Sequence, residues 1–434
     1  MKMKLMYKKI ITAIITWEAK LVIKKYKPTV IAVIGSVGKT STKDAIFTVL
    51  SKYKKVRKSE KSYNSEIGLP LTILGLPNAW SDPFIWIENI LSGIMLIVKK
   101  QPYPDILVLE VGVGKVGDIK KNVLPWLKVD ILVVTRFPDK PVHVEFFGST
   151  DKLIEEKSAM VKALKKGGLL ILNQDDEKVY ALHESSKERA VSFGQDENST
   201  YRILYPNYSF KKFGKVEVPR GINFRIQYKG NVFPVILPLV VGLHNTMQAS
   251  SAIACANELG IDILESIKAV SEFETPPGRL SLIEGVKHSL VIDDTYNSSP
   301  TAAHEAIEIL KEFKGGRKIA VLGDMLELGK YTEEEHRNLG KEVSAIADIL
   351  ITVGPRAKLI GEEALNIMPS ENVYSFDETK DAISFVSGMV EEGDIFLVKG
   401  SQRMRLERLV EAIMKDKDKK GILLCRQDKE WREK

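Results

Sequence analysis

The sequence predicts an α/β protein whose parallel sheets carry helices on both faces. Short apolar runs, each closed by a polar residue or glycine, recur along the chain with helical patterns between them. This alternation is typical of parallel strands joined by crossover helices, and ligands bind such sheets at the carboxyl ends of the strands. The runs cover residues 30–34, 106–109, 131–134, 169–172, 290–292, 319–322, 349–353 and 395–398.

A change in the spacing of apolar residues and a Pro-Pro-Gly sequence indicate where the chain divides into domains. Between about residues 190 and 240 the apolar period becomes two, which predicts a small antiparallel insertion. A helix is expected at 245–259, and a Pro-Pro-Gly sequence at 276–278 interrupts the chain beyond it. We predict a basic amphipathic helix (1–27), a central sheet domain (28–275), a Rossmann-like α/β C-terminal domain (276–415) and a charged, frayed tail (416–434).

Composition is that of a globular protein. The 434 residues suffice for roughly two to three domains with full cores. Formal net charge is +7, and no stretch interleaves basic with aromatic residues as nucleic-acid binding surfaces do, so we expect no nucleic-acid partner. Cys255 and Cys425 are the only cysteines, which predicts no disulfide framework and a reducing, cytoplasmic location.

Two strongly apolar segments lie outside the predicted strands. Ile10, Ile14, Trp17 and Leu21 form one stripe of a helix surrounded by lysines. Such a helix either packs on the following domain or lies on a membrane surface, so residues 1–27 are a possible peripheral membrane contact. The apolar segment 84–98 is too short to span a bilayer and is interpreted as a buried or interfacial helix.

Residues 35–42, Gly-Ser-Val-Gly-Lys-Thr-Ser-Thr, lie between a predicted strand and a predicted helix. Such a turn points backbone N–H groups inward at a helix N-terminus and so binds phosphates. Lys39 is expected to reach the outer phosphates of ATP, and Thr40 to offer its hydroxyl to Mg²⁺. Val33 stands where the usual pattern has glycine, so the loop is a shorter variant. Its predicted ATP-binding residues are Gly35, Ser36, Val37, Gly38, Lys39, Thr40 and Ser41.

Further signatures follow the loop in a fixed order. They are residues 63–70 (Tyr-Asn-Ser-Glu-Ile-Gly-Leu-Pro), 109–112 (Leu-Glu-Val-Gly), 143–145 and 147–148 (His-Val-Glu, Phe-Gly), 242–245 (Gly-Leu-His-Asn), 278–279 (Gly-Arg), 293–300 (Asp-Asp-Thr-Tyr-Asn-Ser-Ser-Pro) and 322–329 (Leu-Gly-Asp-Met-Leu-Glu-Leu-Gly). Together, over residues 28–412, they resemble the Mur ligase family. The last one favours the MurF type, which adds D-alanyl-D-alanine to a peptidoglycan precursor.

The resemblance implies an ATP- and Mg²⁺-dependent ligase, and we expect it to be a monomer. A carboxylate of a muramoyl peptide attacks the γ-phosphate to give an acyl phosphate, and the amine of D-alanyl-D-alanine displaces phosphate to form an amide. Because two anions approach each other, the site needs Mg²⁺ and basic groups. Two rivals stay open: a Mur-type ligase for another amino acid or acceptor, such as another cell-wall polymer or a folate-like polyglutamate, and a non-catalytic nucleotide-binding regulator.

The resemblance also assigns roles to residues. Lys39, His143 and Lys157 are the expected catalytic residues. Thr40, Glu110 and His143 match metal ligands, and Lys157 joins them if it is carbamylated; by composition alone it is an exposed helix residue. Asn245, Arg279 and Asp294 match positions that contact adenine, phosphate and ribose, and Asn245 also suits a helix N-cap. The expected substrate-binding residues are Asn64, Tyr296, Asn297, Asp324, Glu327 and His336, the last of which alone would be a surface histidine.

The sequence departs from the family pattern in three places. The family's N-terminal domain, which holds the UDP-sugar end of the substrate, precedes the phosphate loop, whereas here the loop already begins at Gly35. We therefore expect the site for the UDP-sugar to be missing or supplied differently. The loops at 113–119 and 136–142 also differ from MurF proteins and are expected to face the substrate, which favours altered specificity.

Overall fold

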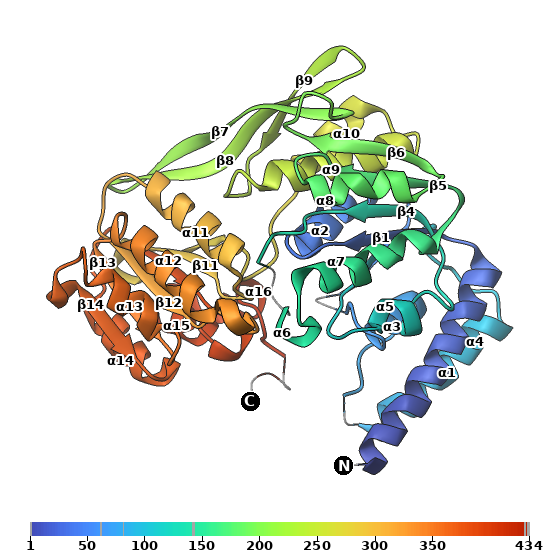
Figure 1. The fold of residues 1–434 in the computed structure, drawn as a ribbon, viewed down its shortest axis with the longest axis horizontal. Helices are drawn as coiled ribbons and strands as arrows, with labels where there is room; N and C mark the ends of the chain where they lie inside the picture. Colours follow the sequence, from blue (N-terminus) through green and yellow to red (C-terminus); the bar gives the residue numbers. More distant parts are fainter. Residues whose placement is uncertain (1, 61–62, 81, 141–143, 429–430, 432–434) are drawn as a thin grey trace.

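A computed structural model describes residues 2–60, 63–80, 82–140, 144–428 and 431, with side chains from residue 8 onward. Its two sheets lie side by side with helices on their faces (Figure 1). The first sheet has the order β2-β3-β1-β4-β5-β6-β7-β8-β9. Its strands are β1 (Thr29–Ile34), β2 (Val56–Lys58), β3 (Ile106–Glu110), β4 (Val129–Val134), β5 (Leu164–Asn173), β6 (Arg189–Gly194), β7 (Tyr201–Phe213), β8 (Val216–Tyr228) and β9 (Asn231–Leu237).

The register of β1 sets the position of the phosphate loop. This strand is parallel to both neighbours, with Val33 opposite Glu110 of β3 and Ile34 opposite Val134 of β4. Every second side chain of β1 faces the same core, because side chains alternate along a strand. The loop that follows Ile34 therefore emerges beside Glu110 at the carboxyl edge of the sheet.

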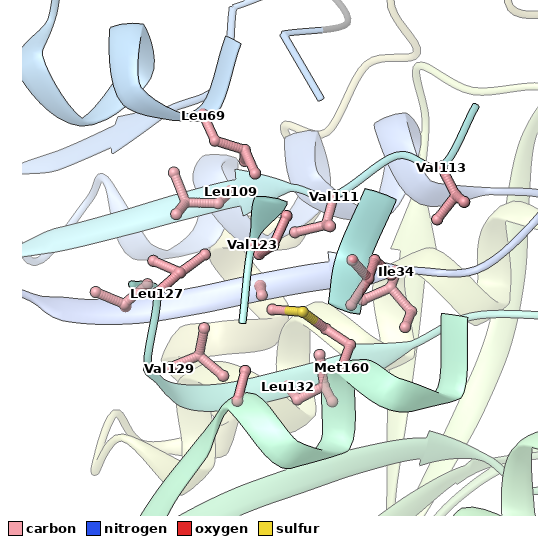
Figure 2. Packing of buried hydrophobic residues seen from close by; sticks show 14 of the residues in the cluster. Ile34, Leu69, Leu109, Val111, Val113, Val123, Leu127, Val129, Leu132 and Met160 are labelled. Atoms are coloured by element: carbon pink, nitrogen blue, oxygen red, sulfur yellow. The ribbon is translucent and has the colours of Figure 1, made fainter. Parts of the chain in front are cut away.

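Helices cover both faces of this sheet. One face packs on α2 (Lys39–Leu50), α9 (Asn245–Glu258) and α10 (Ile263–Val270). The other face, part of which Figure 2 shows around Ile34, Leu109 and Met160, packs on the remaining helices. These are α1 (Lys2–Tyr26), α3 (Gly68–Leu74), α4 (Pro83–Val98), α5 (Asp118–Asn122), α6 (Val144–Phe147), α7 (Thr150–Ser158) and α8 (Glu177–Tyr180).

The antiparallel insertion is present and extends the same sheet. β7 pairs with β6 over a short parallel stretch, and β7, β8 and β9 then run antiparallel. The far end of the β7–β8 hairpin reaches the second half of the molecule (Figure 1), where Val216 and Val218 join its core. Glu217 and Lys314 exchange backbone hydrogen bonds of 2.8 and 3.1 Å.

The second sheet has the order β10-β11-β15-β12-β13-β14, parallel except for β10. Sequence periodicity did not predict β2, β10 or β14, all of which are short edge strands. The strands are β10 (Ser281–Glu284), β11 (Leu290–Asp294), β12 (Lys318–Gly323), β13 (Ile349–Val353), β14 (Val373–Phe376) and β15 (Ile395–Lys399). The helices are α11 (Pro300–Glu312), α12 (Thr332–Ser344), α13 (Lys358–Ala364), α14 (Thr379–Met389), α15 (Glu407–Ile413) and α16 (Lys420–Leu423).

The prediction of a frayed tail is wrong for residues 417–426. Short helical turns lead to Leu424, Cys425 and Arg426, which are all buried. The Arg426 guanidinium donates to the carbonyl oxygens of Thr295 at 2.6 Å and Tyr296 at 2.8 Å. Its charge therefore anchors the tail under the loop that follows β11.

The N-terminal helix packs with a different face from the predicted stripe. Ile11, Ile15, Ala19 and Val22 are buried against the sheet, whereas Trp17 is 56% exposed. The stripe predicted from spacing is thus rotated by about one residue, since a helix turns about 100° per residue. Of the helices in the described residues, none is both long enough and apolar enough to cross a bilayer.

Candidate active site

The phosphate loop has the backbone that its glycines allow. Gly38 adopts a left-handed φ of 82° at the N-cap of α2. A Cβ at Gly35 would lie 2.0 Å from the Thr135 Oγ1, so no larger residue fits there. That hydroxyl donates to the carbonyl oxygen of Val37 at 2.7 Å. β4 therefore supports the loop through Thr135, and the N–H groups that begin α2 stay available to an anion.

A cavity lies on each side of the loop. The α9 cavity, of about 470 Å³, is lined by Gly38, Ser41, the first turn of α9 and, from the second half of the chain, Arg279 and Asp294. The α5 cavity, of about 460 Å³, is lined by Ser36, Lys39, Asn64, Lys157 and the start of α5. The loop thus divides its side chains between two compartments, which suits an enzyme that brings a nucleotide and an acceptor together.

Lys39 and Lys157 meet at Ser36. Lys39 Nζ donates to the Ser36 carbonyl oxygen at 3.2 Å, and Lys157 Nζ donates to its hydroxyl at 2.7 Å. Lys157 is only 4% exposed, so the exposed position suggested by composition is wrong. Burial, together with the charge of Lys39, holds the Lys157 pKa well below its usual range. Burial also lowers the pKa of Lys39, against the opposing effect of Glu110.

Glu110 ends β3 as a buried carboxylate beside this pair of lysines. Its Oε1 accepts from Asn64 Nδ2 at 3.1 Å, and the backbone carbonyl of Asn64 accepts from Gly112 N–H at 2.8 Å. Its Oε2 accepts no hydrogen bond and lies 4.0 Å from Lys43 Nζ. A buried carboxylate oxygen without a hydrogen bond is an available cation ligand. His143 lies outside the described residues.

Arg279 and Asp294 line the α9 cavity, and the loop after β11 packs beside them. Arg279 stacks on the Tyr296 ring at 4.3 Å, and its Nε has no hydrogen-bond partner. Lys399, at the end of β15, donates to Asp294 Oδ2 at 2.5 Å and to the Asn297 carbonyl oxygen at 3.0 Å. The pairing of β11 with β15 therefore fixes Asp294, Tyr296 and Asn297 as one unit.

Asn245 is not an N-cap. The cap of α9 is His244, and the Asn245 side chain instead donates to the carbonyl oxygens of Val241 at 2.7 Å and Gly242 at 3.2 Å. It is fully buried, and its Oδ1 has no hydrogen-bond partner. Its neighbours Thr246 and Gln248 line the α9 cavity in its place. Contact between Asn245 and the adenine stays a prediction.

The residues expected to bind the incoming amine form a supporting network instead. Asp324 is buried and accepts from the N–H groups of Arg356 at 2.9 Å and Ala357 at 2.8 Å. His336 is neither at the surface nor open to a substrate, because it is 0% exposed. Its Nδ1 donates to the Thr332 carbonyl at 2.6 Å and its Nε2 accepts from Met325 N–H at 3.0 Å.

Glu327 differs from both, since it is half-buried and adopts a left-handed φ of 67°. That conformation presents residues 325–328 as a tight turn between the buried Asp324 and α12. Asp324 and His336 therefore help to hold this turn, and direct contact of either residue with the substrate stays a prediction.

Sequence reasoning missed residues that the structure brings to the site. Lys8 of α1 lines the α5 cavity and forms an ion pair with Glu66 at 3.3 Å. Gln248 was missed although it lies one helical turn from Asn245. Of the two atypical loops, residues 113–115 line the α5 cavity and Arg136 lines the α9 cavity. That these loops face the substrate stays a prediction.

Comparisons with known proteins agree with this arrangement. Residues 91–256 match the Mur ligase middle domain, and residues 278–402 match the Mur ligase glutamate ligase domain. A UDP-N-acetylmuramoyl-tripeptide–D-alanyl-D-alanine ligase of Bacillus subtilis (strain 168) is 31% identical over 399 residues, covering 91% of this chain and 78% of that protein. The chain belongs to the Mur ligase family.

Solved structures share the fold of this Mur ligase. MurF from Acinetobacter baumannii matches with a TM-score of 0.74 at 23% identity, covering 92% of this chain and 79% of that one. A MurF ligase from Thermotoga maritima in complex with ADP matches with a TM-score of 0.72 at 24% identity, covering 92% and 83%. The α/β fold class expected from the sequence is confirmed.

Proposed function

We propose that this Mur ligase uses ATP to add D-alanyl-D-alanine to the carboxylate of a muramoyl peptide. The observation that carries the proposal is the meeting of Lys39 and Lys157 at Ser36 on the wall of the α5 cavity, where the charge of Glu110 acts on Lys39. Its relatives in Bacillus subtilis and Escherichia coli, 31% and 26% identical, are named for this ligation. The α9 cavity is assigned to the nucleotide and the α5 cavity to the acceptor.

The residues support both steps of the reaction. An acceptor carboxylate oxygen attacks the γ-phosphorus and ADP leaves, which gives an acyl phosphate. The amine nitrogen then attacks the acyl carbon, phosphate leaves and the amine loses a proton, which completes the amide. Lys39 and the N–H groups of α2 face the phosphate charge in both steps, and such preorganised donors are worth roughly 10²–10³ in rate.

Mg²⁺ is the proposed metal, and the residues present fit it. Glu110 offers a buried oxygen that accepts no hydrogen bond, and hard oxygen donors are what Mg²⁺ prefers. Within the described ranges no three His, Cys, Asp or Glu side chains gather as ligands. Glu110 and Thr40 would hold the metal together with His143, substrate phosphate and a carbamate on Lys157. The metal ion would offset the repulsion between the acceptor carboxylate and the phosphate.

The carbamate on Lys157 is part of the proposal. Burial lowers its pKa and so favours the neutral amine, whose lone pair can attack CO₂ to form an N–C bond with loss of one proton. The product is an anion near Lys39, which replaces two adjacent basic groups by an attractive pair. Bicarbonate labelled with ¹³C should give a carbamate resonance that is absent from Lys157→Met.

A coupled assay for ADP tests the function. We expect ADP release only when muramoyl tripeptide and D-alanyl-D-alanine are both present, and a roughly 10³-fold lower rate for Lys39→Ala. Lys54→Ala, which changes an exposed lysine beyond the end of α2, is the matched control and should keep full activity. Equal rates for wild type and Lys39→Ala would exclude this site as the catalytic one.

A substrate panel separates the proposal from its rivals. Release with another amino acid or with a folate-like acceptor, but not with D-alanyl-D-alanine, would keep the chemistry and reject the substrate. We further propose that the enzyme acts as a cytoplasmic monomer without nucleic acid, and that residues 1–27 contact a membrane surface. Its two cysteines are buried and free, as a reducing compartment requires.

A further inference from the structure

The outer face of α4 is an exposed apolar stripe. Trp86, Asn89, Gly93 and Leu96 turn inward against the rest of the protein. The opposite side carries apolar residues at helical spacing. Phe84 (80%), Ile87 (56%), Leu91 (58%) and Val98 (71%) are more than half exposed, and Ile94 and Met95 are each 40% exposed. A continuous apolar stripe of this kind on a surface helix marks an interaction site.

Exposed lysines lie on the helix that packs beside this stripe and on the segment that follows it. α1 lies beside α4 (Figure 1), with Glu18 of α1 against Gly93 of α4. Lys25 Nζ donates to the carbonyl oxygens of Leu96 at 2.9 Å and Lys99 at 2.7 Å, so the two helices end together. The exposed lysines of the pair and of the segment after α4 are Lys8, Lys9, Lys20, Lys24, Lys25, Lys27, Lys99 and Lys100.

The chemistry of this surface suits a bilayer with anionic headgroups. An apolar stripe flanked by lysines is the pattern of helices that lie in the membrane interface. The sixteen residues of α4 extend about 24 Å, which is less than the roughly 30 Å hydrocarbon core, so the helix lies flat instead of spanning. A second copy of this chain would bring the same lysines against each other, which disfavours self-association.

We propose that α4, together with α1, docks this protein on the surface of an anionic lipid bilayer. The stripe from Phe84 to Val98 enters the interface, and the neighbouring lysines contact lipid phosphates. The proposal extends the membrane contact of residues 1–27 by assigning the main apolar contact to α4. It does not rest on the ligase activity. Because Lys8 of α1 lines the α5 cavity, docking would place that cavity near the membrane surface.

Vesicle co-sedimentation of the full chain tests the proposal. We expect binding to vesicles of phosphatidylcholine and phosphatidylglycerol at 3:1, and at least tenfold weaker binding to phosphatidylcholine alone or in 0.5 M salt. The double variant Ile87→Asp with Leu91→Asp should lower the partition coefficient at least tenfold. Lys20→Glu with Lys24→Glu should do the same and abolish the salt dependence.

A matched control uses apolar residues of similar exposure at the far end of the molecule. Leu365 and Ile367, 48% and 61% exposed, follow α13, and their double change to Asp should leave vesicle binding unaltered. Thermal melting of every variant confirms folding, since all six positions are exposed. Unchanged binding of the α4 variant would overturn the proposal. So would sedimentation showing a dimer that the α4 variant dissociates while vesicles bind neither protein.

Discussion

The surroundings of Lys39 and the turn at Met325 both bury polar side chains, but they satisfy them differently. Around Lys39, Glu110 Oε2 accepts no hydrogen bond and Lys157 Nζ has a single hydroxyl as partner. At the turn, backbone groups occupy both nitrogens of His336. A buried polar atom left unpaired costs about 1–3 kcal/mol. Unpaired atoms next to the phosphate loop therefore indicate where a ligand binds, whereas fully paired ones hold the fold.

Glu110→Gln should have the largest effect on activity. The amide keeps the shape and the contact with Asn64 but loses the anionic oxygen, so we expect ADP release to fall roughly 10²–10³-fold. The melting temperature should also fall, because the variant no longer offsets the charge of the buried Lys43, whose Nζ lies 4.0 Å from Oε2, so activity is compared per folded molecule. Activity within threefold of wild type would show that this carboxylate is not a metal ligand.

Lys157→Met should reduce activity about 10²-fold and leave stability unchanged or slightly raised. The thioether fills the space of the stem, and it removes an amine that burial makes costly to ionise. Small carboxylates such as acetate should restore part of the activity by supplying the anionic oxygen that a carbamate provides. Lys152→Met, at an exposed position of the same helix, is the control.

His336→Ala should affect stability more than chemistry. It removes a buried ring and leaves Met325 N–H without its acceptor, so the free energy of unfolding should fall by about 3–5 kcal/mol. Activity per folded molecule should stay within tenfold of wild type. Urea unfolding and the ADP assay on the same sample measure both, and a large loss of activity in a stable variant would return His336 to the substrate site.

The same residue predicts the direction of an acid effect. Burial lowers the His336 pKa below its ordinary value of about 6.5, so the folded state binds its proton less readily than the unfolded state. Stability from this group is therefore full above pH 6.5 and is lost as the pH falls below it. His336→Gln should weaken that acid dependence in urea titrations at pH 5.5 and 7.5.

Parallel strands and the phosphate loop could be predicted from sequence because both are local signals. The apolar runs that became β1, β3 and β4 are buried on both faces, and the glycines of the loop have few other uses after a strand. The short edge strands β2 and β14 could not, because only three and four residues pair there and their side chains are half-exposed.

Some residues of the candidate site could likewise be predicted from sequence and others could not. Glu110 and Lys157 could be proposed from their place in the family pattern, and register and burial then bring them to the loop. The role of His336 could not, since nothing local distinguishes a histidine that faces a substrate from one whose two nitrogens bind backbone. The burial of Arg426 was equally hidden, because its partners Thr295 and Tyr296 lie far away in sequence.

Of these variants, Glu18→Gln should have the smallest effect, and the effect is on the pH dependence of stability. Glu18 is fully buried and neither carboxylate oxygen accepts a hydrogen bond, yet it lies against Gly93 of α4 and not beside the phosphate loop. Burial raises its pKa to about 7, so the folded state holds the proton that the unfolded state releases near 4.5. The free energy of unfolding should therefore fall by about 1.4 kcal/mol per pH unit between those values.

Between pH 5.5 and 7 this amounts to about 2 kcal/mol that wild type loses and Glu18→Gln keeps. Urea titrations at those two pH values measure the difference. Glu88→Gln, which changes an exposed position of α4, should lose the same stability as wild type over this pH range. An equal pH dependence in wild type and Glu18→Gln would mean that Glu18 has a partner. An oxygen without a visible hydrogen bond would then not be evidence of a ligand site. The contrast between Glu110 and His336 would have to be tested with bound ligand.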